Sequence, residues 1–194
     1  IDKGELFVKL FHKALEGDAD CGGLMAFNYY SGEGITDLDE GRPVFARTPT
    51  ARFTLANFMR THIMSALATL KLGMDILING EQVKIDKLYG HGGFFKTPGV
   101  GQRMLSAAVK APVSVMETAG EGGPYGMALL AAYRLHQAAG ETLEDYLDEK
   151  VFANAKASTL MADAEEMAGF DRFTAVYAAA LPMEKAAIAA LREE

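Results

Sequence analysis

The chain has 194 residues, 49% of them hydrophobic, which suffices for one domain with a sizeable core. Its formal net charge of −7 and pI near 5.2 weigh against a nucleic-acid-binding protein, which normally has a basic face, and against a polybasic membrane anchor. Cys21 is the single cysteine and no apolar run reaches the ~18–20 residues of a membrane span, so we expect no disulfide, no membrane association and a cytoplasmic location.

The first half of the sequence predicts two helices, separated by a short strand and a long loop. Apolar residues recur at helical spacing in residues 3–16 and 54–78, so both segments are expected to be helices. Residues 23–27 form an apolar run that is expected to be a buried strand. Residues 28–52 contain glycines and prolines and are expected to form a long loop.

The second half predicts the order strand, glycine-rich turn, helix, and then the same order again. Residues 83–89 alternate apolar and polar side chains, which is typical of a strand, and residues 112–116 are a second short apolar strand. Each strand runs into glycines, at 90–93 and at 117–123, and Pro98 is expected to start the first of the two helices. Such an alternation predicts parallel strands with crossover helices.

The remaining residues, 141–194, are rich in alanine and predict a helical carboxyl-terminal extension of a single domain that comprises residues 1–194. Pro182 is expected to start or kink the last helix, because proline lacks the N–H that a helix interior uses. The predicted fold is therefore an α/β domain with a small mixed sheet and a majority of helix.

The turn Gly90-His91-Gly92-Gly93 has the features of an anion-binding loop. Glycines allow the backbone to approach a ligand closely and to adopt positive φ. A following helix offers unpaired N–H groups and a partial positive charge at its start. Because a second glycine-rich turn is expected at the same edge of the sheet, where ligands bind in open α/β sheets, we favour a ligand site over two turns that serve packing alone.

Two sequence motifs of nucleotide-binding proteins can be compared with this turn: the P-loop and the dinucleotide fingerprint. A P-loop is excluded, because no Gly-Lys-Ser/Thr follows. The dinucleotide fingerprint is matched by its first two glycines, and Glu117 stands where a ribose-binding acid is expected. Phe95 occupies the place of the third glycine and is expected to obstruct close packing of helix and strand. A nicotinamide dinucleotide-binding domain therefore stays open as an alternative.

The histidines and the carboxylates of the long loop are not expected to form a catalytic or metal site. The four histidines show no metal-ligand spacing. His91 is the histidine of interest because it lies in the glycine turn, although an exposed turn residue is the simpler interpretation. The carboxylates of the long loop are expected to be solvated rather than catalytic, and they are Glu33, Asp37, Asp39 and Glu40.

The order of these segments resembles the carboxyl-terminal domain of the FGGY carbohydrate kinase family, which has the actin-like (ribonuclease H-like) ATPase fold. The resemblance covers about residues 5–180 and rests on the segments 27–45, 55–77, 88–93 and 121–128. Gly34 departs from the family pattern, which usually has Arg there, and Thr61-His62 stands in place of the usual Glu-Gly.

The resemblance implies that the parent protein transfers a phosphoryl group from ATP, with Mg²⁺, to a sugar hydroxyl, with a pentulose such as xylulose or ribulose as the expected substrate. It implies contacts to the nucleotide from Gly90, His91, Gly92, Gly93, Phe94 and Thr97, the last near adenine. The family's sugar site, catalytic Asp and Gly-Thr phosphate loop have no counterpart here, so no catalytic residue is assigned and Mg²⁺ would be held with the missing amino-terminal part.

The expected partners are thus a sugar, ATP and a missing amino-terminal domain, and a homo-oligomer stays open. Ile1 is not a natural initiator residue, so we expect the chain to begin inside a longer protein and to be inactive by itself. The departures at Gly34 and Thr61-His62 leave a further alternative open, a regulatory relative of the sugar kinases that has lost catalysis.

Overall fold

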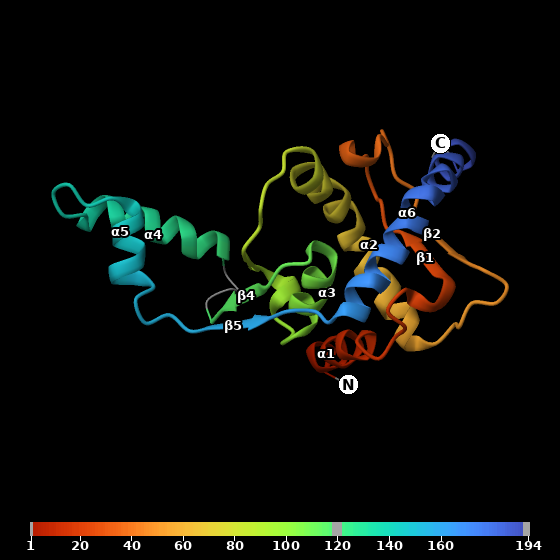
Figure 1. Ribbon diagram of the computed structural model, residues 1–194, viewed down its shortest axis with the longest axis horizontal. Helices are drawn as coiled ribbons and strands as arrows, with labels where there is room; N and C mark the ends of the chain where they lie inside the picture. The colour runs from red at the N-terminus through yellow and green to blue at the C-terminus, as the bar shows by residue number, and fades with distance from the viewer. Residues whose placement is uncertain (1, 118–121, 192–194) are drawn as a thin grey trace.

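A computed structural model describes residues 2–117 and 122–191, which form a helix-rich body with a smaller projecting lobe (Figure 1). In chain order the elements are α1 (Lys3–Ala14), β1 (Leu24–Phe27), β2 (Val44–Arg47), α2 (Leu55–Asp75), β3 (Leu88–Tyr89), α3 (Val100–Val109), β4 (Val113–Met116), α4 (Gly122–His136), α5 (Leu143–Tyr146), β5 (Ala157–Leu160) and α6 (Ala164–Ala190). A π-helical turn follows α2 at Ile76–Gly80, and another follows α5 at Leu147–Val151.

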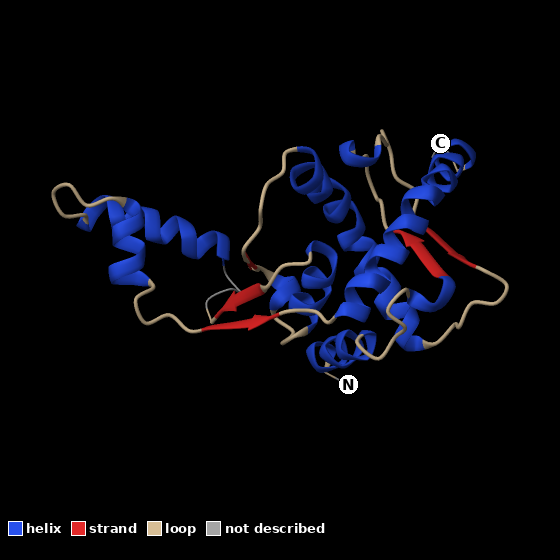
Figure 2. Cartoon of the chain, in the orientation of Figure 1, coloured by secondary structure: helices blue, strands red, loops and turns tan. Residues whose placement is uncertain are grey.

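The strands of the described residues form two small sheets (Figure 2). In one sheet, β1 and β2 are antiparallel, with Leu24 opposite Arg47 and Phe27 opposite Val44. In the other, β3 and β4 are parallel and β5 pairs with β4 antiparallel. The predicted parallel pair and the mixed character of its sheet are confirmed.

Helix α2 forms the centre of the body and contacts α1, β1, α3 and α6. The hydroxyl of Thr54 caps it by accepting the N–H of Asn57 at 3.1 Å. Met64 and Ala68 of α2 are fully buried, as the wide apolar surface of the sequence predicts. Within the described part, Leu55–Gly80 also has the length and apolar composition of a membrane span. Its contacts on several sides account for that apolar surface in this fold.

The boundaries predicted for the loop 28–52 and for the strand 83–89 are wrong. The loop predicted over 28–52 contains β2, whose four residues are too short to give a periodic signal and become a strand by pairing with β1. The strand predicted over 83–89 is reduced to Leu88–Tyr89. Ile85 packs against the core, but Val83 is 44% exposed, and the pairing with β4 includes only Leu88 and Tyr89.

The carboxyl-terminal segment differs from its all-helical prediction in two ways. It contains β5, and its last helix, α6, runs through Pro182 without a break. The residue whose carbonyl would lose its partner, Ala178, is exposed, so water can take the place of the missing N–H. Phe170, Phe173 and Tyr177 are buried along α6 and hold the helix to the core.

Glu184 of α6 is fully buried, and its carboxylate accepts the backbone N–H of Arg42 at 2.6 Å. Its second oxygen has no hydrogen-bond partner in the described part of the chain. Burial raises the pKa of the Glu184 carboxyl, although the bond from Arg42 and the Arg42 charge act in the opposite direction. Ionisation of Glu184 therefore costs stability as the pH rises through the pKa of the folded state.

We expect Glu184→Gln to raise the free energy of unfolding by about 1 kcal/mol at pH 7, because the amide still accepts the Arg42 N–H and carries no buried charge. The gain should vanish below about pH 4, where the wild-type carboxyl is protonated in both states. Urea unfolding at the two pH values measures this. A variant less stable than wild type at pH 7 would contradict it.

Candidate functional site

The glycine turn lies directly after β3, at the carboxyl end of the parallel strand pair. The N–H of Gly90 donates to the carbonyl of Ser114 at 2.8 Å, which continues the ladder one residue beyond β3. Gly92 has φ +96°, a conformation that L side chains rarely adopt. Apart from the two chain neighbours of each glycine, no heavy atom of the described residues lies within 4 Å of a Cβ built on Gly92 or Gly93. The turn therefore requires glycine at 92, and its backbone faces open space at 92 and 93.

The backbone donors of this turn are partly unused. The N–H groups of Phe95 and Lys96 bond back to the carbonyls of Gly92 and Gly93 and close a short 3₁₀ turn over Gly93–Phe95. Within the described residues, the N–H groups of Gly92 and Gly93 make no backbone hydrogen bond outside helices and strands. Open space beside unpaired N–H groups is the arrangement that an anion requires.

Phe95 does not obstruct the packing of strand and helix, contrary to the expectation from the sequence. A Cβ built on Gly90 would lie 2.5 Å from its ring, and one built on Gly101 of α3 would lie 3.0 Å from it. The ring therefore fills the space that two glycines leave, and Phe94 packs against it with ring centroids 5.2 Å apart. The residue at position 95 therefore does not exclude a dinucleotide site.

Thr97 follows the turn in the chain and is 3% exposed. The helix predicted from Pro98 begins two residues later, at Val100, after Gly99 with φ +79°. His12 of α1 connects to this segment, because its Nε2 lies 3.2 Å from the carbonyl oxygen of Pro98. The Thr97 side chain is part of this packed support, whereas His91 in the turn is exposed.

A cleft of about 1070 Å³ opens beside the turn, between the strand ends and the lobe formed by α4, α5 and the π-turn. His91 and Tyr89 line it on the turn side, and apolar side chains together with Glu144 and Asp148 line it on the lobe side. Those on the lobe side include Tyr125, Leu129, Leu143, Leu147 and Phe152. The sequence analysis missed this contribution from residues 143–152, although Leu143 and Leu147 at i and i+4 carried the helical signal for an apolar face.

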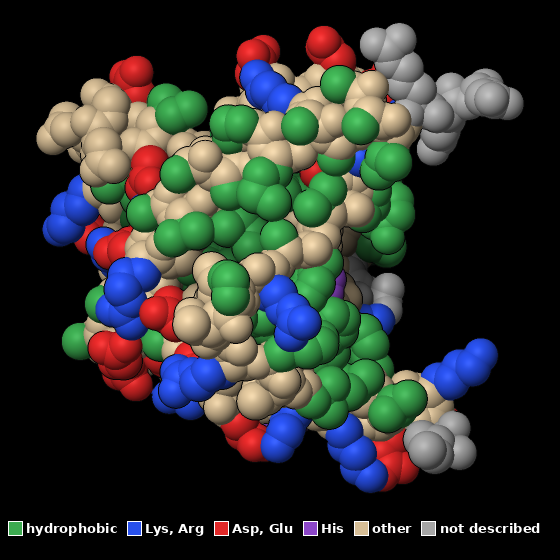
Figure 3. Space-filling view, turned by 90° about the vertical axis from the view of Figure 1, so that its right-hand side faces the viewer, with side chains coloured by type: hydrophobic (Ala, Val, Ile, Leu, Met, Phe, Trp, Pro, Cys, Tyr) green, Lys and Arg blue, Asp and Glu red, His purple; other side chains and the backbone are tan. Residues whose placement is uncertain are grey.

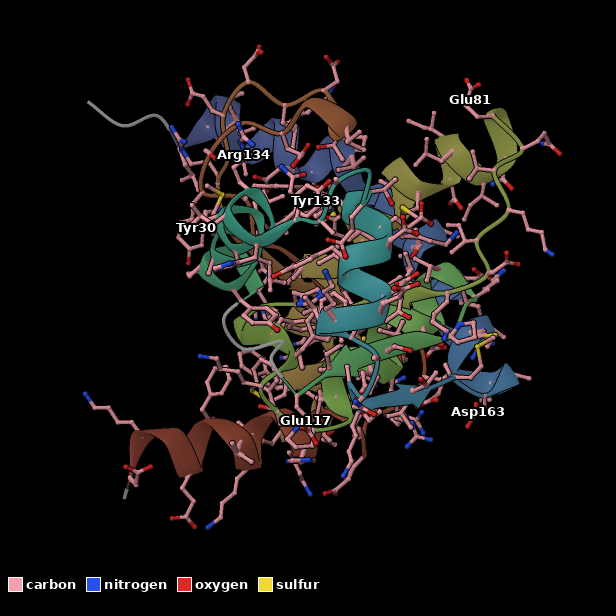
Figure 4. The ribbon with its side chains drawn as sticks, turned by 90° about the vertical axis from the view of Figure 1, so that its left-hand side faces the viewer. Tyr30, Glu81, Glu117, Tyr133, Arg134 and Asp163 are labelled. Atoms are coloured by element: carbon pink, nitrogen blue, oxygen red, sulfur yellow. The ribbon has the colours of Figure 1, made fainter. Side chains whose placement is uncertain are left out.

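The second glycine-rich turn lies in part outside the described residues, because these end at Glu117 and resume at Gly122. Gly122 approaches the first turn closely, since a Cβ built on it would lie 2.8 Å from Cβ of His91. Glu117 is exposed at the end of β4 (Figure 4). The start of α4 is therefore adjacent to the first turn.

The other candidate residues form no metal site within the described part of the chain. The described part holds no group of three or more His, Cys, Asp or Glu that could bind a metal ion. In the loop 28–52, Glu40 pairs with Arg42 and Asp37 with Lys185, and Glu33 accepts the N–H of Ile35. Burial lowers the pKa of His62, whose ring contacts Asn28.

The similarity of this chain to known proteins identifies its family. The chain belongs to the FGGY family of carbohydrate kinases: residues 1–135 match the family's C-terminal domain. A search of curated proteins by sequence finds no match.

Solved structures with the same fold include carbohydrate kinases with different substrates. Xylulose kinase from Rhodospirillum rubrum superposes with a TM-score of 0.68 at 19% identity, over 95% of this chain and 36% of that one. Gluconate kinase from Lactobacillus acidophilus gives 0.67 at 18% identity, over 92% and 34%. Plasmodium falciparum glycerol kinase with ADP gives 0.67 at 14% identity, over 95% and 34%.

These likenesses confirm the predicted actin-like, ribonuclease H-like fold, and the match of residues 1–135 to the family confirms the predicted family. The chain spans about a third of the length of the solved kinases that it matches.

Proposed function

We propose that this chain is the nucleotide-side part of an ATP-dependent carbohydrate kinase that phosphorylates a hydroxyl of a pentulose, as a xylulose or ribulose kinase does. The observation that carries the proposal is the turn at 90–93. It joins a parallel strand pair to α3, needs glycine at 92, and has N–H groups at 92 and 93 without a backbone partner outside helices and strands among the described residues, beside open space at the built Cβ positions. Family membership supports the class of reaction, and the xylulose kinases among the structural neighbours support the substrate.

In this proposal the nucleotide phosphates approach Gly92 and Gly93, where no side chain of the described residues other than the chain neighbours lies within 4 Å of a built Cβ. His91 and Phe94 border that approach, and Gly90 joins the turn to the sheet. Thr97 follows the turn and lies near the adenine in this proposal; because its side chain is 3% exposed, its backbone would make the contact. Phosphoryl transfer depends on positioning and charge stabilisation, and a rigid glycine turn supplies positioning.

A Mg²⁺ ion does not fit this chain as a complete site, since its described residues offer no group of three metal-ligating side chains. Mg²⁺ commonly keeps several waters and is held by one or two carboxylates together with substrate phosphates. We therefore assign its protein ligands to the part of the kinase outside this chain.

The exposed apolar surface of α4 supports the proposal that this chain is part of a larger protein. Helix α4 has no buried residue in the described structure, and Met127 and Leu135 are 69% and 77% exposed. An apolar surface of this kind is normally covered by protein. We propose that the preceding part of the kinase covers it, that the chain by itself lacks activity, and that the complete enzyme works in the cytoplasm.

Sugar-dependent ADP formation by the complete polypeptide tests the proposal. With ATP and Mg²⁺, we expect kcat/KM for xylulose or ribulose to exceed the values for gluconate and glycerol by at least about 100-fold, a difference of about 2.7 kcal/mol in transition-state binding. A preference for gluconate or glycerol would reject the pentulose and keep the kinase.

A regulatory relative without catalysis is the second candidate. Thr61 stands where the family usually has Glu, is fully buried, and donates to the carbonyl of Asn57 in its own helix at 2.7 Å. This position thus has a structural bond in place of a carboxylate. ADP formation with none of the sugars, by a protein that binds ATP, would favour this candidate.

A further inference from the structure

Helix α1 contacts the segment that follows the glycine turn through two consecutive side chains. The ring of Phe11 meets the ring of Phe94 edge to face, with centroids 6.3 Å apart. Nε2 of His12 lies 3.2 Å from the carbonyl oxygen of Pro98. The short piece of chain from Phe94 to Pro98 is therefore attached to α1 at both of its ends.

The His12 ring lies between two carbonyl oxygens. Nδ1 is 3.0 Å from the carbonyl oxygen of Val8, one turn earlier in α1, and Nε2 faces Pro98. A carbonyl oxygen only accepts, so a ring nitrogen that bonds to one must carry a proton. The Val8 carbonyl lies inside a helix, whose own ladder supplies it with a donor. In the described part of the chain, no backbone N–H outside helices and strands donates to the Pro98 carbonyl. The bond from Nε2 is therefore the one that this carbonyl needs.

The bond to Pro98 lies between the turn and α3. Thr97 precedes it and has a side chain that is 3% exposed. The ladder of α3 begins at the next residue, since the N–H of Arg103 donates to the carbonyl of Gly99 at 3.1 Å. A shift of the Pro98 carbonyl would therefore move the backbone of Thr97 and the start of α3 together.

We propose that His12 is a positioning residue for the nucleotide. Its Nε2–H holds the Pro98 carbonyl and, through it, the backbone of Thr97 and the glycine turn against α1. This inference rests on the proposed function, in which that turn binds ATP. His12 is itself exposed, so water competes for the bond and the expected effect on ATP affinity is about fivefold rather than larger.

Two amides at position 12 separate this bond from the rest of the side chain. The side-chain nitrogen of glutamine can reach the place of Nε2, whereas that of asparagine ends near the place of Nδ1. In the complete kinase, we expect His12→Asn to raise the Kd for ATP about fivefold. His12→Gln should stay within about twofold of wild type, because its amide still donates to Pro98. Calorimetry with ATP measures both. A loss of folded protein would lower the number of binding sites per chain and leave the Kd unchanged.

Lys9→Asn is the matched control. It introduces the same residue, with the same lower helix propensity, into α1. Lys9 pairs with Glu5 at 2.6 Å, and the two side chains are 70% and 61% exposed, so this pair contributes little. The charged side chains of α1 stand out into solvent at the lower edge of the molecule in Figure 3. We expect Lys9→Asn to leave the ATP affinity within about twofold of wild type.

An unchanged Kd in His12→Asn would overturn the role of His12. Equal losses in His12→Asn and His12→Gln would do so too, as would a loss in Lys9→Asn as large as that in His12→Asn. Gly93→Val, a substitution in the turn itself, separates this role from the proposed function. If Gly93→Val weakens ATP binding and His12→Asn does not, the turn binds the nucleotide without help from His12. If neither variant weakens it, both proposals fail.

Discussion

Gly93→Val in the complete kinase is expected to weaken ATP binding by about 100-fold, or about 2.7 kcal/mol. Gly93 is the better position to test than Gly92, because φ +96° at Gly92 would strain any substituted residue and mix folding with binding. At Gly93 the space is open and φ is ordinary, so a valine fits the folded turn. Its branched side chain would occupy the space in which we place the phosphates. Calorimetry with ATP measures the loss.

Gly34→Val provides the control for this substitution. Gly34 also has no heavy atom within 4 Å of a built Cβ and no positive φ, and it lies in the loop between β1 and β2. We expect it to leave the ATP affinity unchanged within about twofold, and circular dichroism should show both variants folded. An unchanged ATP affinity of Gly93→Val would show that the nucleotide does not bind at this turn. It would not affect the family membership.

Gly169→Ala is expected to lower the free energy of unfolding of the chain by about 3 kcal/mol or more. In an isolated helix interior the same change would stabilise by about 1 kcal/mol, because alanine has the higher helix propensity. Gly169 is buried in α6, however, and a Cβ built on it would lie 2.3 Å from Cβ of Ala19 and 2.5 Å from the Ala19 backbone. The two segments would have to separate, which opens the surrounding core.

Gly126→Ala is the matched control, since Gly126 also lies inside a helix, α4, but has no heavy atom within 4 Å of a built Cβ. There we expect an increase of about 0.5–1 kcal/mol, the ordinary helix effect. Urea unfolding of the two variants and the wild type under one condition measures both values. Stabilisation by both substitutions would show that α6 is not held as closely to residue 19 as the structure has it.

The periodic part of the fold was predictable from the sequence. The helices α1, α2 and α3 and the strands β1 and β4 carry apolar residues at the period of their own structure, and each lies close to its predicted position. Strands β2 and β5 were missed because four residues give too little periodicity, and each becomes a strand only by pairing with a neighbour. Residues 83–87 show the reverse case, with alternation but no partner.

The candidate site, too, was predictable from the sequence only in part. The turn at 90–93 was recognisable because glycines between a strand and a helix have few uses. The sequence did not show that Gly92 alone of its residues has positive φ, or that the ring of Phe95 rests on Gly90 and Gly101. Nor could it show the cleft beside His91, because the lobe that closes it lies tens of residues further along the chain.

The sequence by itself determined the family, the main helices and the parallel strand pair with its glycine turn, because these follow from local periodicity and from residue types with restricted uses. The tertiary structure decided which glycines are needed for space and which for backbone conformation, that Glu184 is buried, and that His12 reaches the carbonyl of Pro98. Each of these depends on contacts between segments distant in the chain, and such contacts leave no periodic signal in the segments themselves.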